Sequence, residues 1–239
     1  MIPLYDDNPT RTVPWVTYTL IVLNAVVFLY ELILGDAGQA ALFREWGVRP
    51  IEYWQLSSVR EPIVTGVVLP LFTSMFLHGG FMHIISNMLF LWVFGDNVED
   101  RFGHGKYLLL YLGFGLAATA THILFSPDSA IPTVGASGAI SGVLGAYLVF
   151  YPRARVHTLI PIFFIMLMRE IPAVLFLGIW FGLQVFSGLG SLVSNVGGVA
   201  WWAHIGGFVA GAALALVWRM TFGDPDDPDD YEYAEFRPV

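Results

Sequence analysis

The segment GASGAISGVLGAYLVFY, residues 135–151, carries no charged side chain and places Gly138 and Gly142 four residues apart. Small residues at this spacing let membrane helices pack closely together. From Ser137 to Tyr151 the segment provides 15 residues, fewer than the roughly 20 that a spanning helix needs. We therefore predict a short membrane helix that begins below the membrane surface and is reached by a loop dipping into the membrane.

The rest of the chain has the composition of a membrane protein. Of its 239 residues, 56% are hydrophobic and 13% are charged, and the mean hydropathy is +0.66. A soluble domain carries about 25% charged residues, so a soluble enzyme, a disordered chain and a basic nucleic-acid-binding protein are excluded. We predict an all-α membrane protein, a bundle of six transmembrane helices. The predicted spans are residues 15–34, 81–94, 107–125, 137–151, 172–186 and 202–218.

The basic residues predict how the bundle is oriented. The connections on one side of the predicted membrane hold eight Lys and Arg residues, and those on the other side hold three. The positive-inside rule then places both termini in the cytoplasm. We expect a cytoplasmic segment at residues 1–14, a transmembrane domain at 15–220 with a long outside loop at 35–66, and a disordered acidic tail at 221–239.

Three chemically useful side chains fall at one depth of the predicted membrane. His83, Ser137 and His204 lie in spans that run in the same direction, from the outside to the cytoplasm. At about 1.5 Å per residue, each lies roughly 20–24 Å from the charged residue that marks the cytoplasmic end of its span. These side chains can therefore meet in one pocket in the outer half of the bilayer. Asn87 lies one helical turn deeper than His83 on the same face.

This set of residues is suited to acyl transfer. Ser137 opens a helix, where unpaired backbone N–H groups and the helix dipole favour an oxyanion. His204 can act as the general base of a serine nucleophile. His83 and Asn87 can donate hydrogen bonds to the developing oxyanion. No acidic residue of the neighbouring spans lies at the same level, so we predict a Ser–His dyad and not a triad.

Each residue taken alone has a plainer interpretation. Ser137 between glycines is typical of helix packing, a single His in a span is as often structural as functional, and Asn87 suits a helix–helix hydrogen bond. Their common depth favours the catalytic interpretation. Around them we predict supporting or packing roles, with His78 near the outer mouth of the pocket. The residues in this group are His78, Gly135, Gly138, Ser141 and Gly207.

Nothing in the sequence indicates a metal or a cofactor. The chain has no Cys, no His-Glu-x-x-His pattern, and Asn87 instead of His one turn after His83, so the usual zinc ligand patterns do not occur. We therefore expect no metal, and we expect no nucleic-acid partner. The lipid bilayer is an expected partner.

Three motifs together resemble the rhomboid family of intramembrane serine proteases. They are HGGFMHIISN at residues 78–87, GASG at 135–138 and AHIGG at 203–207. The stretch FGDNVEDRFG at 94–103 is also similar to the end of the family's second helix, and the similarity extends over nearly the whole of residues 15–218.

The resemblance implies a six-helix bundle in the plasma membrane, the inner membrane of a bacterium, with the active site open to the outside. It implies Ser137 as nucleophile, His204 as base, and an oxyanion hole made by His83, Asn87 and the Ser137 backbone amide. The partners and substrates would be transmembrane helices of single-pass membrane proteins, cut near the outer end of their span after a small residue, and no cofactor would be needed. Access would involve movement of the fifth helix, which here carries Trp180.

Two positions depart from the family pattern, and other functions remain open. Ser141 stands where many relatives have an aromatic residue that packs on the imidazole, and Leu69-Pro70 stands where some have Trp-Arg. A non-catalytic rhomboid-like binder of membrane helices is the main alternative, although such proteins lose the Ser or the His. A transporter would show inverted repeats and paired broken helices, and we find no internal repeat.

Overall fold

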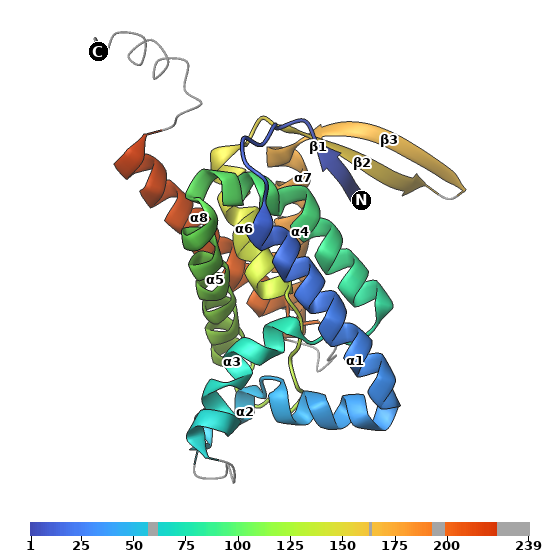
Figure 1. Cartoon of the computed structure of the whole chain (residues 1–239), viewed down its shortest axis with the longest axis vertical. Helices are drawn as coiled ribbons and strands as arrows, with labels where there is room; N and C mark the ends of the chain where they lie inside the picture. Colours follow the sequence, from blue (N-terminus) through green and yellow to red (C-terminus); the bar gives the residue numbers. More distant parts are fainter. Residues whose placement is uncertain (57–61, 163, 193–198, 224–239) are drawn as a thin grey trace.

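The computed structural model describes residues 1–56, 62–162, 164–192 and 199–223 and shows a helical bundle with a small sheet at one end (Figure 1). The predicted acidic tail at 221–239 therefore lies almost wholly outside the described residues. The long helices are α1 (Trp15–Trp46), α4 (Phe81–Phe102), α5 (His104–Phe125), α6 (Ser137–Phe150), α7 (Ala173–Ser191) and α8 (Trp201–Phe222). The shorter ones are α2 (Pro50–Trp54), η2 (Val64–Val68), α3 (Pro70–Thr73) and η3 (Ser74–Phe76).

Each predicted span corresponds to one of the six long helices, and the lengths and compositions agree with a multi-pass membrane protein. Four of them, α1, α5, α7 and α8, are long and apolar enough to cross a membrane. A fifth span results if α4 is counted with the segment Val64–Phe76, from which it is bent by 78°. The remaining helix, α6, has only 14 residues, as expected for a helix that starts inside the membrane.

The segment predicted as an outside loop, residues 35–66, is largely helical. Gly35 adopts φ 63° and ψ 178° and breaks α1 at the end of the predicted span. A positive φ is a conformation that glycine adopts without steric cost. Beyond it the chain continues as helix to Trp46 across one end of the bundle (Figure 1). Ala37, Ala40, Ala41 and other good helix formers explain this continuation.

The protein is mostly helical, as predicted, but it also contains a three-stranded antiparallel sheet that the all-α prediction missed. Its strands are β1 (Ile2–Asp6), β2 (Arg155–Ile162) and β3 (Ile165–Pro172), in the order β1-β2-β3. The prediction weighed only the charges of this connection between α6 and α7. It neglected the β-branched residues that favour strands, which are Val156, Thr158, Ile160, Ile165 and Ile171.

The turn between α6 and β2 fixes the start of α7. The Ala173 N–H donates to the Ala154 carbonyl at 2.8 Å, and the Val174 N–H donates to the Pro152 carbonyl at 3.0 Å. β1 joins the N-terminal segment to the same sheet through its pairing with β2. We call the end of the bundle that carries β1–β3 the sheet end and the opposite end the site end.

Helix α6 forms the centre of the bundle. Every residue from Gly138 to Tyr147 is buried, and the helix packs against α4, α5 and α8. Its neighbours shield it from the surroundings, so its sequence can be rich in glycine and alanine although these side chains offer little apolar surface. A central helix of this kind sets the positions of all residues at its N-terminus.

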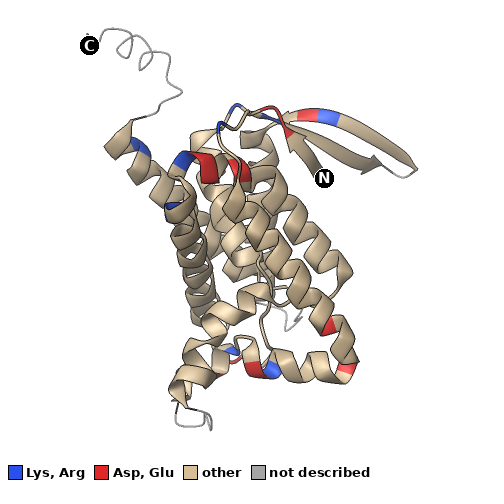
Figure 2. Ribbon diagram, in the orientation of Figure 1, with Lys and Arg blue, Asp and Glu red and all other residues tan. Residues whose placement is uncertain are grey.

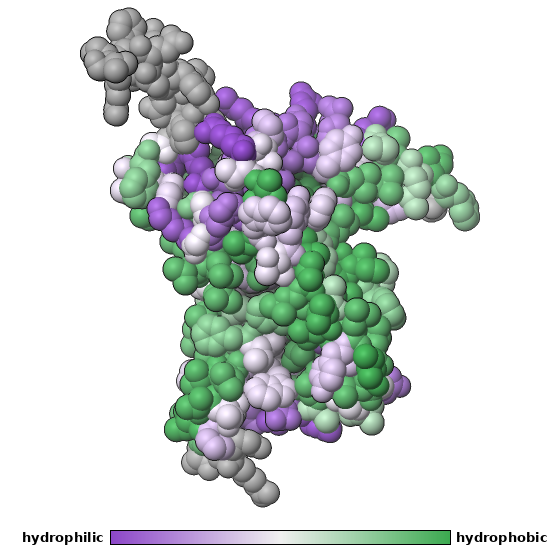
Figure 3. Space-filling view, viewed as in Figure 1, coloured by the Kyte–Doolittle hydropathy of each residue, from purple (hydrophilic) through white to green (hydrophobic). Residues whose placement is uncertain are grey.

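The surface is divided into an apolar belt and two polar ends. Charged residues gather at the sheet end and the site end (Figure 2), and a hydrophobic band covers the middle of the molecule (Figure 3). At the sheet end the buried Glu99 carboxylate accepts the backbone N–H groups of Val16 and Thr17 at 2.9 and 2.7 Å. It thereby satisfies donors in the first turn of α1 and locks that helix to α4.

We predict that a carboxyl group at the sheet end makes the stability of the fold depend on pH. Burial raises the pKa of the Asp6 carboxyl to about 6, although the hydrogen bond from the Tyr147 hydroxyl opposes this shift. Because the folded protein holds this proton more tightly than the unfolded chain, the stabilisation is complete below about pH 4 and is lost as the pH rises to about 6. Asp6→Asn should flatten this part of the curve of unfolding temperature against pH in detergent and raise the unfolding temperature at pH 7.

The exposed Asp36→Asn serves as the control for this prediction, since it lies at the site end and should leave the curve unchanged. Parallel curves for Asp6→Asn and the wild type between pH 4 and 6 would show that the Asp6 carboxyl does not bind its proton more tightly in the folded state.

Candidate active site

The first residue of α6, Ser137, is held in place by the loop that precedes it. The Gly135 N–H donates to the Ser74 carbonyl at 2.8 Å, and Val48 and Thr133 exchange two backbone hydrogen bonds. The first backbone hydrogen bond of α6 runs from Ile140 to the Ala136 carbonyl. The N–H groups in the first turn of α6 therefore have no acceptor within the helix, which is the arrangement that favours an anion.

The structure brings Ser137 and His204 together, as expected from their common depth. Oγ of Ser137 lies 2.8 Å from Nε2 of His204. Glycines permit this approach, because a Cβ on Gly207 would overlap with the Gly138 carbonyl, and one on Gly211 with the Gly142 carbonyl. The two four-residue glycine pairs thus face each other and form the α6–α8 contact.

The sequence analysis missed a third member of this group, Gln184. Its Oε1 lies 2.8 Å from Nδ1 of His204, and its side chain, in the middle of α7, is buried. The rule that polar residues inside a span indicate function applied to Gln184 as well. It was overlooked because the search for a partner of His204 considered only acids.

His83 lies beside the serine with a defined orientation. Its Nδ1 accepts the Gly79 N–H at 3.2 Å, so the ring proton is on Nε2. That atom lies so close to Gly135 that a Cβ there would be 2.7 Å from it, and Gly135 itself has φ 128°. A side chain at position 135 would therefore push the His83 ring out of its present place.

Asn87 presents a donor towards the same space. The side chain is buried and lines the cavity, and its Nδ2 has no hydrogen-bond partner in the part of the chain that the structure describes. A buried amide without an acceptor is costly. An oxygen bound in the cavity near Ser137 would supply one.

The expected supporting residues have clear contacts. His78 is fully buried and packs edge-on against His83, with ring centroids 5.1 Å apart. It does not line the cavity that contains the serine, so its place is behind His83 and not at a mouth. Its backbone N–H donates to Glu31 at 3.0 Å. Ser141 donates its hydroxyl proton to the Ser137 carbonyl at 2.6 Å, so it does not contact His204 as an aromatic side chain would.

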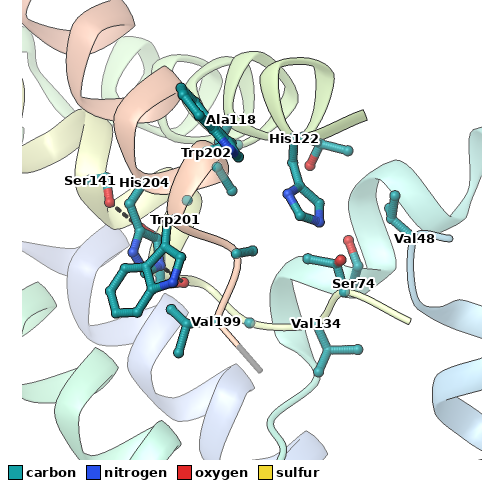
Figure 4. Close-up of a pocket in the computed structure, with 18 of the residues that line it drawn as sticks. Val48, Ser74, Ala118, His122, Val134, Ser141, Val199, Trp201, Trp202 and His204 are labelled. Atoms are coloured by element: carbon teal, nitrogen blue, oxygen red, sulfur yellow. Dashed lines mark hydrogen bonds between the residues drawn. The ribbon is translucent and has the colours of Figure 1, made fainter. Parts of the chain in front are cut away.

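Ser137 and His204 lie on the wall of a cavity of about 1040 Å³. The wall also includes His83, Asn87 and Trp180. His204 and Trp201 lie on one side of the cavity and His122 and Ser74 on the other (Figure 4). The size suits several residues of an extended peptide. Trp180 on α7 is 6.0 Å from the His204 ring and 6.4 Å from the Phe90 ring of α4, measured between centroids. It therefore lies where α7 closes the cavity against α4.

Comparisons with known proteins agree with the motifs. A family described as the Rhomboid domain matches residues 65–221. Rhomboid protease GluP of Bacillus subtilis (strain 168) is 31% identical over 210 residues, which cover 88% of this chain and 37% of the relative. RHOMBOID-like protein 1 of Arabidopsis thaliana is 33% identical over 67% of this chain. RHOMBOID-like protein 6, mitochondrial, from the same plant is 30% identical over 58%. The chain spans 37%, 38% and 52% of the lengths of these relatives.

We predict that the close α6–α8 contact contributes to the free energy of unfolding. Gly207→Ala should lower the free energy of unfolding by about 1–3 kcal/mol, because the added methyl overlaps with a backbone oxygen of α6 that cannot move aside. Gly178→Ala on α7 is the matched control, since a Cβ there meets no atom within 4 Å. Thermal unfolding of the two variants in detergent decides the point, and equal unfolding temperatures would contradict the close contact.

Proposed function

Because the chain belongs to the rhomboid family, we propose that it is an intramembrane serine endopeptidase that uses Ser137 as nucleophile and His204 as general base. The observation that carries the proposal is the 2.8 Å hydrogen bond between these side chains at the edge of a cavity within the bundle. A hydroxyl and an imidazole at this distance form the nucleophile–base pair of acyl transfer.

The reaction proceeds in two steps, acylation of Ser137 and hydrolysis of the acyl-enzyme. Oγ of Ser137 attacks the peptide carbonyl carbon, and the hydroxyl proton moves to Nε2 of His204. The tetrahedral intermediate then collapses, the C–N bond breaks, and His204 gives its proton to the leaving amine. In the second half, water gives a proton to His204 and its oxygen attacks the acyl carbon, after which the ester bond breaks and Ser137 regains the proton.

Three donors surround the position of the oxyanion. They are Nε2–H of His83, Nδ2–H of Asn87 and the backbone N–H of Ser137. The His83 ring has its orientation set before substrate binds, because its Nδ1 accepts the Gly79 N–H. Donors fixed in this way stabilise developing charge without reorganising during the reaction.

The substrates are transmembrane segments of single-pass proteins, cut near the outer end of the span after a small residue. A substrate helix has satisfied its own backbone groups, so it must unwind to expose a carbonyl to Ser137. Residues that weaken a helix near the cut site should therefore speed cleavage. Trp180 and the rest of α7 form the gate through which the segment enters.

The sheet end of the bundle faces the cytoplasm, with both termini on that side, six helices crossing the plasma membrane and the cavity open to the outside. Support comes from the excess of Lys and Arg in the connections of the sheet end. In a bacterium this is the inner membrane. No cofactor takes part.

The dyad is tested with a fluorophosphonate probe, which reacts with activated serines, and with cleavage of a single-span substrate in detergent. The wild type should label and cleave, while Ser137→Ala and His204→Ala should lose both activities, because each removes one half of the nucleophile–base pair. The control is Ser191→Ala, which removes a different hydroxyl from the cavity wall and should keep both labelling and cleavage. Labelling that survives Ser137→Ala would show that another serine is the nucleophile. A folded protein that binds the substrate helix without cutting it would be a non-catalytic binder.

The oxyanion hole is tested at Asn87. Asn87→Ala should lower kcat by about 10²- to 10³-fold and leave KM nearly unchanged, because the amide acts on charge that develops only after binding. Asn87→Asp keeps the size, removes the donors and should be slower still, since its charge repels the oxyanion. A loss confined to KM would assign Asn87 to substrate binding instead.

A further inference from the structure

Resting on the proposed function, we propose that Gln184 is the positioning residue for His204, and that through it the place of α7 decides whether the base is aligned. Two hydrogen bonds carry this proposal: Oε1 of Gln184 lies 2.8 Å from Nδ1 of His204, and Nε2 of Gln184 donates to the Trp180 carbonyl at 3.3 Å.

These two contacts fix the tautomer of the histidine. The amide nitrogen of Gln184 is used by the Trp180 carbonyl, so the oxygen faces the imidazole. A carbonyl oxygen only accepts, and Nδ1 of His204 must therefore carry the ring proton. The other ring nitrogen, Nε2, is then unprotonated and accepts from Ser137. This is the state that a general base needs.

No other described side chain performs this task. In the ranges that the structure covers, His204 makes no side-chain hydrogen bond beyond those to Gln184 and Ser137, and the other titratable side chains that line its cavity are His83, His122 and Asp128. The rings of Trp180 and Trp201 are 6.0 and 6.2 Å away at 35° and 88°, so neither is stacked on the imidazole. The Ser141 hydroxyl donates to the Ser137 carbonyl of its own helix and so does not reach the imidazole.

The location of Gln184 links alignment to access. Ser137 and His204 belong to α6 and α8, whose contact is tight, whereas Gln184 belongs to α7, the helix that carries Trp180. A hydrogen bond at 2.8 Å does not survive a displacement of 1 Å. When α7 moves away to admit a substrate, the base loses its orienting partner. When α7 returns, the hydrogen bond from Gln184 aligns His204 again. The dyad is therefore fully active only in the closed enzyme.

The test measures kcat and KM for cleavage of a single-span substrate. Gln184→Met keeps the size and removes the acceptor, and it should lower kcat by about 10- to 100-fold with KM within about twofold. The matched control is Leu183→Met, which introduces the same side chain on the exposed face of α7 and should leave both constants unchanged. Unfolding temperatures of both variants show whether the bundle is intact.

Gln184→Glu separates positioning from packing. Its carboxylate still accepts from Nδ1 and stabilises the protonated ring, so it should restore most of kcat while moving the acidic limb of the kcat profile to higher pH. A merely structural glutamine would give no such displacement. Unchanged kcat in Gln184→Met, with a wild type that cleaves, would overturn the positioning role and leave the proposed function intact. A wild type that neither cleaves nor labels would overturn both.

The link to α7 is tested by a double-mutant cycle with Trp180→Ala, which loosens the contact between α7 and α4. The substitution should lower kcat in the wild-type background and have no further effect on kcat in Gln184→Met. Fully additive losses would show that α7 does not act on the base through Gln184.

Discussion

The site depends on one close contact, between the N-terminal half of α6 and α8. Gly138 and Gly142 face Gly207 and Gly211 so closely that no side chain fits between the two backbones. The hydroxyl of Ser137 and the imidazole of His204 meet because the helices that carry them meet. In a membrane, helices are not driven together by the hydrophobic effect, so packing of small residues must provide the association.

The second constraint is that polar groups in the apolar belt need partners. Glu31 is buried and accepts the backbone N–H of His78, and Asn24 donates to the Leu20 carbonyl of its own helix. Several buried polar atoms of the described residues lack such a partner, among them Nδ2 of Asn87, Nε1 of Trp202 and both ring nitrogens of His78. Asn87 and Trp202 line the cavity, where a bound ligand atom can supply the missing acceptor.

Much of this arrangement could be predicted from the sequence, because the helix rise converts residue number into depth. The predicted helix starts at Phe81 and Ser137 agree with the structure, and the end predicted at residue 34 coincides with the break at Gly35. Depth does not tell which face of a helix meets which neighbour, and Gln184, although it lies on a predicted span, was not predicted because only acids were considered as partners of His204. The sheet was not predicted for another reason. Its pairing joins residues 2–6 to residues 155–162, and such distant contacts leave no local pattern beyond the β-branched residues.

The attachment of α7 at the sheet end determines how this helix can move. Ala173 and Val174 are tied to the turn after α6, while the other end of α7 stops at Ser191. Towards its other end α7 packs on α8, where Gly188 faces Ile205 and Trp201, so a swing of α7 about the sheet-end attachment must open this contact. At about 1.5 Å per residue, Gln184 lies roughly 16 Å along the lever and Ser191 roughly 27 Å. A swing that opens the mouth by a given distance would thus displace Gln184 by about three-fifths as much, so an opening of only a few ångströms suffices to release the imidazole.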